Sequence, residues 1–132
     1  MGVKALLKNS EGKYLLLRRN PEKYPEMSAK WDIVGGRIDP GSTLLENLKR
    51  EIKEETSLDL NDSPALIAAQ DILRVPGRHV VRLTYAANIE GTPKLDSDHL
   101  EFAWFTLEEM KNLSEAELDI YFKELLDQGK FD

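Results

Sequence analysis

Apolar residues fall in short runs through most of the chain, but after residue 42 they follow the spacing of a helix. Leu44, Leu45, Leu48 and Ile52 lie on one side of such a helix, because residues three and four positions apart share a face. This stripe predicts an amphipathic helix over residues 43–56 that packs against a sheet.

The remaining runs predict strands, because they are bounded by turn-forming residues. They cover residues 3–8, 13–18, 31–34, 65–74, 79–90 and 101–105. The proline-containing or polar residues 20–30 and 91–100 predict loops. Two more helices are expected to begin at Thr106 and Ser114, since each is followed three residues later by a capping-box glutamate. The last helix is expected to pack through an apolar face and to end near Gly129. This order predicts an α/β fold with helices on both faces of a mixed sheet.

Length and composition narrow the class of protein. The 132 residues are enough for a single domain, 1–132, with a core of its own. The chain has no cysteine, which excludes disulfides and zinc–thiolate sites. We find neither a signal peptide nor a membrane-spanning run and therefore expect a cytoplasmic protein. The net charge of −6 argues against non-specific binding to nucleic acid.

Three glutamates on the predicted helix suggest metal chemistry. Glu51, Glu54 and Glu55 fall within an arc of roughly 100° on the helix surface. Like charges this close repel one another unless a positive charge lies among them. Mg²⁺ or Mn²⁺ suits that role, because both prefer carboxylate oxygens. Arg50 precedes Glu54 by four residues, so an ion pair between them is expected. Taken alone, such a helix face is more often simply a solvated surface.

The glycine-rich stretch before the helix favours metal binding over a solvated surface. Together, this stretch and the helix resemble the signature of a Nudix hydrolase. The positions that match the Nudix box are Gly36, Arg50, Glu51, Ile52, Glu54, Glu55 and Leu58. Two positions depart from it, since Ser42 stands in place of the first glutamate and Ser57 in place of the late glycine. The strand before the box, its lead-in around Trp31 and the late strand at 101–105 also resemble the family.

The resemblance implies an α/β/α sandwich and hydrolysis of a pyrophosphate bond in a nucleoside diphosphate linked to another group, X. It implies that Mg²⁺ or Mn²⁺ is held by Glu54, Glu55, Glu51 and the carbonyl of Gly35. Glu51 is expected to act as a ligand or as the general base. Arg50 is expected to orient the carboxylates, so that Glu51, Arg50 and Glu54 form the catalytic set.

Both departures from the Nudix box lie at positions that support the helix, and neither removes a predicted metal-binding carboxylate. The first box glutamate usually braces the loop by pairing with basic groups, which Ser42 cannot do as an anion. Either Ser42 or Thr43 can instead cap the helix. Ser57 stands where the family has a left-handed glycine, a conformation that is less favourable for serine.

Other candidate residues lie outside the box. The arginines that are candidates for contacting phosphate are Arg18, Arg37, Arg78 and Arg82. A further acidic ligand or base is expected from the loop before the late strand, with Asp96, Asp98 and Glu101 as candidates. His79 and His99 are candidate acid–base groups. Trp31 or Tyr24 is a candidate for stacking on a base. For most of these residues, taken singly, an ordinary surface or packing role is the commoner alternative.

The sequence is also compatible with other functions. A Nudix-like module that binds a nucleotide or a protein without catalysis is the main rival, because function resides in the site and not in the fold. RNA processing is a weaker reading, because the sequence shows no basic stripe or aromatic platform. The sequence does not identify the nucleotide derivative, the number of metal ions or the general base. A homodimer, common among such relatives, also stays open.

Overall fold

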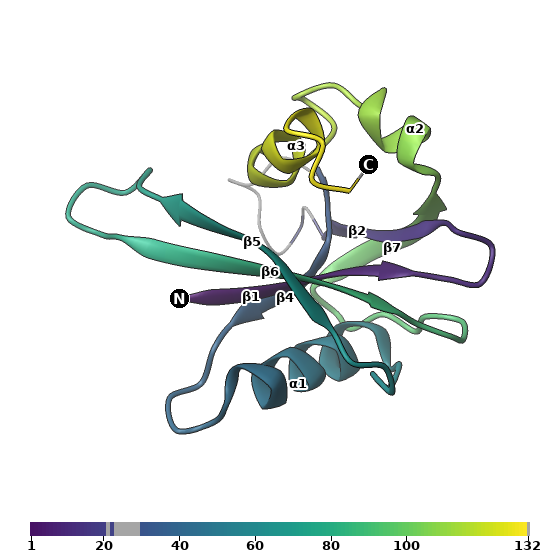
Figure 1. Cartoon of the computed structure of the whole chain (residues 1–132), viewed down its shortest axis with the longest axis horizontal. Coiled ribbons are helices and arrows are strands. Elements are labelled where there is room, and N and C mark those ends of the chain that lie inside the picture. The colour runs from purple at the N-terminus through teal and green to yellow at the C-terminus, as the bar shows by residue number, and fades with distance from the viewer. Residues whose placement is uncertain (21, 23–29, 132) are drawn as a thin grey trace.

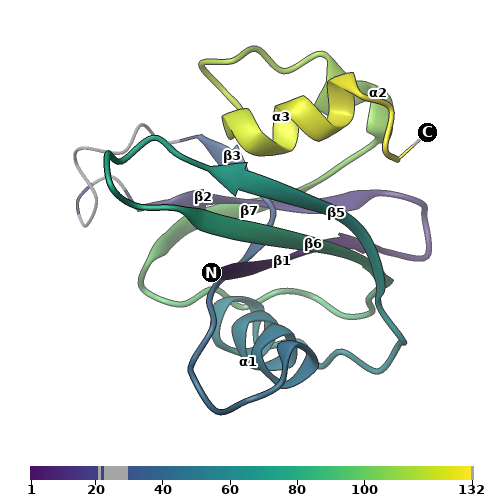
Figure 2. The same ribbon diagram turned by 60° about the vertical axis from the view of Figure 1, so that its left-hand side comes forward.

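The computed structural model describes residues 1–20, 22 and 30–131. It consists of a twisted sheet with one helix on one face and two shorter helices on the other, as Figures 1 and 2 show. The strands are β1 (Gly2–Lys8), β2 (Tyr14–Arg19), β3 (Trp31–Asp32), β4 (Val34–Arg37), β5 (Ala65–Ile72), β6 (Val80–Asn88) and β7 (His99–Phe105). The helices are α1 (Leu44–Thr56), α2 (Leu107–Lys111) and α3 (Ile120–Asp127). The predicted α/β/α arrangement is confirmed.

The sheet is mixed. Its strands run in the order β3-β2-β1-β6-β5, with β4 beside β1 and β7 beside β2. Strands β1 and β6 are parallel, whereas the other pairs are antiparallel. The sheet buries a separate hydrophobic cluster on each face, because successive residues of a strand point to opposite sides. Val3, Leu48 and Ile52 belong to the cluster under α1, and Leu6, Leu16 and Phe122 to the cluster under α3.

The long helix begins and ends as its sequence indicates. Thr43 is the N-cap, and its side chain accepts a hydrogen bond from the Glu46 amide at 3.1 Å. Ser57 ends the helix with φ 63° and ψ 11°, the left-handed conformation expected there. The capping box at Thr106 is also confirmed, at the start of α2.

Two predicted elements are wrong in their boundaries. The glycines Gly35 and Gly36 lie within strand β4, because β4 pairs with β1 from Val34 to Arg37, and the bend follows this strand. The final helix begins at Ile120 and not at Ser114. Its predicted first turn is held out of the helix by Trp31, whose N–H donates to the Glu117 carbonyl and whose carbonyl accepts from the Asp119 amide, both at 2.8 Å.

Smaller differences concern strand ends. The strand expected over 65–74 ends at Ile72, and the strand expected over 79–90 runs from Val80 to Asn88. The residues between them connect a β5–β6 arm that extends beyond the rest of the sheet (Figure 1). Among the helices of the described residues, none is long and apolar enough to span a membrane.

Candidate active site

Strand β4 brings the box helix against the sheet through two glycines. Gly35 has φ +139°, and a Cβ atom there would lie 2.1 Å from the Val3 carbonyl oxygen. A Cβ atom on Gly36 would lie 2.7 Å from Glu51 Oε2. Any larger residue at either position would therefore displace backbone or a site carboxylate. The two glycines allow carboxylates of α1 to lie directly beside the β4 backbone.

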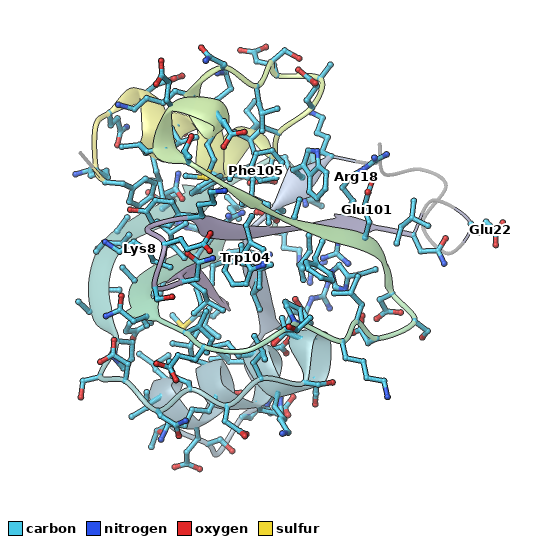
Figure 3. The ribbon with its side chains drawn as sticks, turned by 90° about the vertical axis from the view of Figure 1, so that its right-hand side faces the viewer. Lys8, Arg18, Glu22, Glu101, Trp104 and Phe105 are labelled. Carbon is cyan, nitrogen blue, oxygen red and sulfur yellow. The ribbon has the colours of Figure 1, made fainter. Side chains whose placement is uncertain are left out.

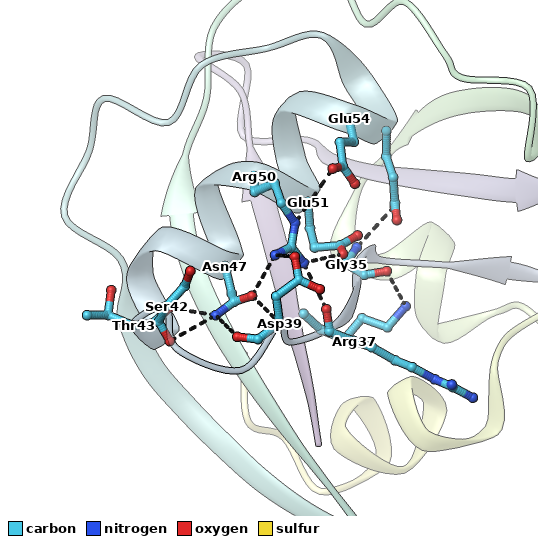
Figure 4. A network of polar contacts seen from close by, with 11 residues as sticks. Gly35, Arg37, Asp39, Ser42, Thr43, Asn47, Arg50, Glu51 and Glu54 are labelled. Carbon is cyan, nitrogen blue, oxygen red and sulfur yellow. Dashed lines mark hydrogen bonds and ion pairs between the residues drawn. The ribbon is translucent and has the colours of Figure 1, made fainter.

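Arg50 contacts two of the three glutamates, as the sequence predicted. Its Nη2 donates to Glu51 Oε1 at 2.8 Å, and its Nε lies 3.6 Å from Glu54 Oε1. The same guanidinium donates to the Arg37 carbonyl at 2.9 Å and pairs with Asp39 (Figure 4). Arg50 thus connects the loop after β4 to the carboxylates of α1 and fixes their direction.

Asn47 is a residue of this site that sequence reasoning missed. It is fully buried, and its Oδ1 accepts from the Asp39 amide at 2.6 Å and from Arg50 at 2.7 Å. Its Nδ2 donates to the carbonyls of Ser42 and Thr43 at 3.2 and 2.8 Å. Asn47 therefore braces the loop with a neutral amide, where the family usually uses the charged glutamate that Ser42 replaces. An asparagine at a helix position next to apolar residues was the available signal.

Glu55 is the most enclosed carboxylate of the three, with 10% of its side chain exposed, against 12% for Glu51 and 59% for Glu54. The expectation that Glu51 and Glu55 are partly desolvated is thus confirmed. Glu55 Oε1 accepts from the Gly35 amide at 3.1 Å. Burial raises the pKa of Glu55 to about 8, with Lys4 and the Gly35 amide acting in the opposite direction. The charges of Glu51 and Asp96 raise this pKa further.

Two groups beside Glu55 come from other segments. His99 Nε2 lies 3.9 Å from Glu55 Oε1, and its Nδ1 lies 2.7 Å from Asp96 Oδ1. Of the three candidate acids in that region, Asp96 is the one whose charge acts on Glu55. Glu101 instead pairs with Arg18, and the Asp98 carbonyl accepts from the Asn20 amide at 2.8 Å.

Lys4 was also missed, because nothing in a strand sequence marks a lysine that turns toward a site. Its Nζ donates to Asp32 Oδ2 at 3.0 Å, to the Ile33 carbonyl at 3.2 Å and to the Gly35 carbonyl at 3.4 Å. The carbonyl predicted to bind metal therefore lies beside an ammonium group in this structure.

The predicted metal ligands fit a hard divalent cation in their chemistry, since they offer carboxylate and carbonyl oxygens around a buried, poorly compensated charge. In the part of the chain that the structure describes, however, no three acidic or histidine side chains converge on one point. Glu51 and Glu54 bond Arg50, whereas Glu55 faces Gly35 and His99. Binding of a cation would require some of these side chains to turn.

The candidate phosphate-binding arginines lie in different surroundings. Arg18 pairs with Glu101 and lies over the Trp31 ring at 5.5 Å, and Figure 3 shows Arg18 and Glu101 side by side. Arg82 is 4% exposed and bonds Asp119 at 2.9 Å and Asp32 at 3.1 Å. Arg82 is therefore part of a buried ion network. Arg37 and Arg78 are exposed.

The structure also gives the surroundings of two of the remaining candidate residues. His79 pairs with Asp71 at 2.6 Å on the surface of the β5–β6 arm, away from α1. Trp31 contacts Phe105 edge to face, with ring centroids 5.1 Å apart, which is a packing role. Tyr24 lies outside the described residues.

A pocket of about 380 Å³ adjoins the glycines on the sheet face that α3 covers. We call it the central pocket; residues that line it include Lys4, Asp32, Gly36, Arg82, Asp119 and Tyr121. Lys4 and Arg82 pair with Asp32 and Asp119, but Arg19, Lys30, Arg37 and Arg74 also line the pocket, so its walls are mainly basic. Gly36 lies both in its wall and against the Glu51 carboxylate, so the pocket and the candidate metal site share this residue, although none of the three candidate glutamates of α1 lines the pocket. Its size suits a small-molecule ligand.

Known proteins of similar structure have the same fold over nearly the whole chain. A MutT protein from Methanosarcina mazei Go1 superposes with a TM-score of 0.83 at 26% identity, covering 96% of this chain and 89% of that one. A MutT NUDIX hydrolase from Burkholderia pseudomallei gives a TM-score of 0.76 at 27% identity, covering 96% and 95% of the two chains.

Relatives found by sequence have similar identities but are longer than this chain. The human 8-oxo-dGDP phosphatase NUDT18 is 28% identical over 108 residues, which is 78% of this chain but 31% of the human protein. A Mycobacterium tuberculosis protein, provisionally named 8-oxo-dGTP diphosphatase 2, is 27% identical over 89 residues, which is 67% of this chain and 62% of that protein. The chain thus spans less than two thirds of the length of these relatives. The model of the NUDIX domain matches residues 1–126, and the chain therefore belongs to the NUDIX family.

Proposed function

We propose that the chain hydrolyses a pyrophosphate bond in a nucleoside diphosphate-X substrate with the help of a divalent metal ion. The observation that carries this proposal is the state of Glu55, a carboxylate that is 10% exposed and next to the charges of Glu51 and Asp96. A buried charge with so little compensation favours the binding of a cation.

Members of the NUDIX family generally use divalent metal ions. We assign Mg²⁺ or Mn²⁺ to the oxygens of Glu51, Glu54 and Glu55 and to the Gly35 carbonyl. When bound, the ion would neutralise phosphate charge and acidify a water molecule.

The protein's own residues would position the reacting groups. Arg50 directs Glu51 and Glu54, and the Gly35 amide directs Glu55. A carboxylate accepts a proton from water, for which we propose Glu51 or Asp96, the two acids whose charges act on Glu55. In the reaction a P–O bond forms to the water oxygen and one P–O bond of the bridge breaks, without any redox change. Two phosphate-bearing products result.

The nucleoside part is proposed to bind in the central pocket. Arg82, Asp32 and Asp119 line it and offer donors and acceptors to a bound base or sugar. Because the relatives are named for 8-oxo-dGTP and 8-oxo-dGDP, we propose oxidised guanine nucleotides as the first substrates to test.

The test is a substrate panel with Mg²⁺ or Mn²⁺, with and without a chelator. It includes 8-oxo-dGTP, 8-oxo-dGDP, dGTP, a nucleoside diphosphate sugar and a dinucleoside polyphosphate. We expect turnover that the chelator abolishes. For Glu55→Gln we expect kcat/KM to fall by about 10²–10³-fold with the fold retained by circular dichroism. Glu108→Gln is the matched control, because Glu108 is exposed in α2, away from the site. Unchanged turnover in Glu55→Gln would refute the site assignment.

One observation favours a second function, a nucleotide-binding module without catalysis. Arg50 already pairs with two of the three candidate ligands, which can hold the site together without metal. The departures from the box do not add to this case, since Thr43 caps α1, Asn47 braces the loop and Ser57 adopts the required conformation. Tight nucleotide binding that is unaffected by a chelator, with no turnover of the panel, would favour the module.

A further inference from the structure

A second hollow continues the central pocket along the base of the β5–β6 arm. It has a volume of about 190 Å³, and three arginines line it, Arg37, Arg74 and Arg78. We call it the arginine groove. Gly2, Ile72 and Val80 line both hollows, as do Arg37 and Arg74, so the two are continuous. Arg37, which lines both hollows, directly follows Gly36, the residue that lines the central pocket and also lies against the Glu51 carboxylate.

Among the described residues, no acidic side chain lines the arginine groove, so its charges are not balanced. Within residues 1–20, 22 and 30–131, no carboxylate forms an ion pair with Arg37, Arg74 or Arg78. The nearby acids are engaged elsewhere, because Asp39 pairs with Arg50 and Asp71 with His79. Three unneutralised guanidinium groups thus share a small hollow in a protein whose net charge is −6.

The arginines come from two separate parts of the chain. Arg37 ends β4, next to the candidate metal site, whereas Arg74 and Arg78 lie in the connection between β5 and β6. The Arg74 guanidinium lies 5.9 Å from the centre of the Tyr121 ring of α3, a contact that restrains it at the border of the two hollows. Guanidinium groups bind phosphate with two parallel hydrogen bonds, which makes phosphate the anion that this arrangement fits best.

We propose that the arginine groove binds a phosphate group of X that lies beyond the pyrophosphate bridge. The preferred substrates would then be nucleotides with a third phosphate, and the matching diphosphates would be poor substrates. This inference rests on the proposed function, because it places the bridge at Glu51 and the nucleoside in the central pocket. The third phosphate can be the end of a triphosphate chain or an internal phosphate of a dinucleoside polyphosphate.

The kinetic test compares two substrates that differ by one phosphate, 8-oxo-dGTP and 8-oxo-dGDP. We expect kcat/KM of the parent protein to be at least about tenfold higher for the triphosphate, since a charged hydrogen bond contributes a factor of this size. In Arg74→Gln/Arg78→Gln, this ratio should fall at least about tenfold, mainly through KM of the triphosphate. Two further substrates extend the test. Diadenosine tetraphosphate carries an internal phosphate beyond the bridge, whereas in ADP-ribose the group X is neutral.

The matched control is Lys49→Gln/Lys94→Gln, which removes the same charge from exposed positions outside both hollows. It should leave the ratio of the two kcat/KM values unchanged. An equal loss of kcat/KM on both substrates in the arginine variant, or a parent protein without preference, would overturn the inference while leaving the proposed function intact.

A binding measurement separates the two proposals further, because it needs no turnover. Inorganic tripolyphosphate, titrated by calorimetry, should bind the arginine variant at least about tenfold more weakly than the parent and the lysine control. Equal affinities for all three proteins would refute the groove as a phosphate site, even if the chain hydrolyses none of the panel.

Discussion

Asp32 and Glu55 are two shielded carboxylates on either side of β4, but their charges are compensated in very different ways. Asp32 bonds Lys4 at 3.0 Å, Arg82 at 3.1 Å and the Ile33 amide at 2.7 Å. Burial alone would raise the pKa of Asp32, but Lys4 and Arg82 together lower it below its usual value. Burial raises the pKa of Glu55 to about 8, since one backbone amide and the more distant Lys4 compensate it only in part.

This difference separates a group that holds the fold together from a group that is poised for a ligand. The network of Asp32, Arg82 and Asp119 satisfies its own charges and joins β3, β6 and the start of α3. Glu55 has no such network, and the cost of suppressing its ionisation makes the folded state less stable until a cation binds. Poorly compensated groups of this kind are typical of functional sites, where stability is lost in favour of activity.

The largest effect should come from breaking the balanced network. Asp32→Asn keeps the shape of the side chain but leaves Lys4 without a countercharge and Arg82 with Asp119 alone, so we expect a loss of about 3 kcal/mol in the free energy of unfolding. The experiment is urea denaturation at pH 7, followed by circular dichroism.

The difference in stability between the parent and Asp32→Asn should depend on pH. Because the folded-state pKa of Asp32 is lowered, its contribution to stability is complete above the usual value of 3.8 and is lost as the pH falls through the folded-state pKa. The difference between parent and variant should therefore shrink between pH 4 and the acid limit of folding. A constant difference over that range would show that the charge of Asp32 is not what the variant removes.

A smaller effect of the opposite sign is expected for Glu55→Gln in the presence of a chelator. At pH 7 the unfolded state ionises Glu55, whereas the folded state, with a pKa of about 8, holds it mostly protonated, so removing the carboxyl should raise the free energy of unfolding by about 2 kcal/mol. Because burial raises the folded-state pKa above the usual 4.5, the gain should vanish below that pH and be largest above pH 8. Glu108→Gln, at an exposed position, should change stability by less than about 0.5 kcal/mol.

If Glu55→Gln instead destabilises the metal-free protein, Glu55 belongs with Asp32 as a structural group. Thermal denaturation with and without Mn²⁺ extends the test, since the ion should stabilise the parent and have little effect on the variant.

The smallest effect is expected at Ser57, which contacts neither Asp32 nor Glu55. Ser57→Gly relieves a left-handed conformation, φ 63°, but loses the hydrogen bond from Ser57 Oγ to the Lys94 carbonyl at 3.0 Å. We expect a net gain of about 0.5–1 kcal/mol, which should add to the effect of either carboxylate variant. Denaturation of the double variants checks this, and a gain that depends on Asp32 or Glu55 would contradict it.

Features that depend only on residues close together in the sequence were predictable. Helix α1, its cap at Thr43, its left-handed end at Ser57 and the Arg50–Glu54 pair all follow from residues within one segment. The family resemblance added the role of the glycines, although it did not show that they form a strand.

The parts that depend on pairing between distant segments were not predictable. Lys4, Asp32, Arg82 and Asp119 come from four elements, and no spacing in the sequence connects them. The start of α3 was wrong for the same reason, because the competing partner of residues 117–119 is the backbone of Trp31. The two hollows likewise exist only where the β5–β6 arm meets β4 and α3.

Lys4 acts on both carboxylates, because its ammonium bonds Asp32 directly and its charge also acts on Glu55. Substitutions on opposite faces of the sheet are therefore not independent in this protein, and their effects should show epistasis wherever Lys4 is shared. An evolutionary path that altered nucleotide selectivity on one face would have to preserve, or rebuild through compensating changes, the electrostatic setting of the metal ligands on the other.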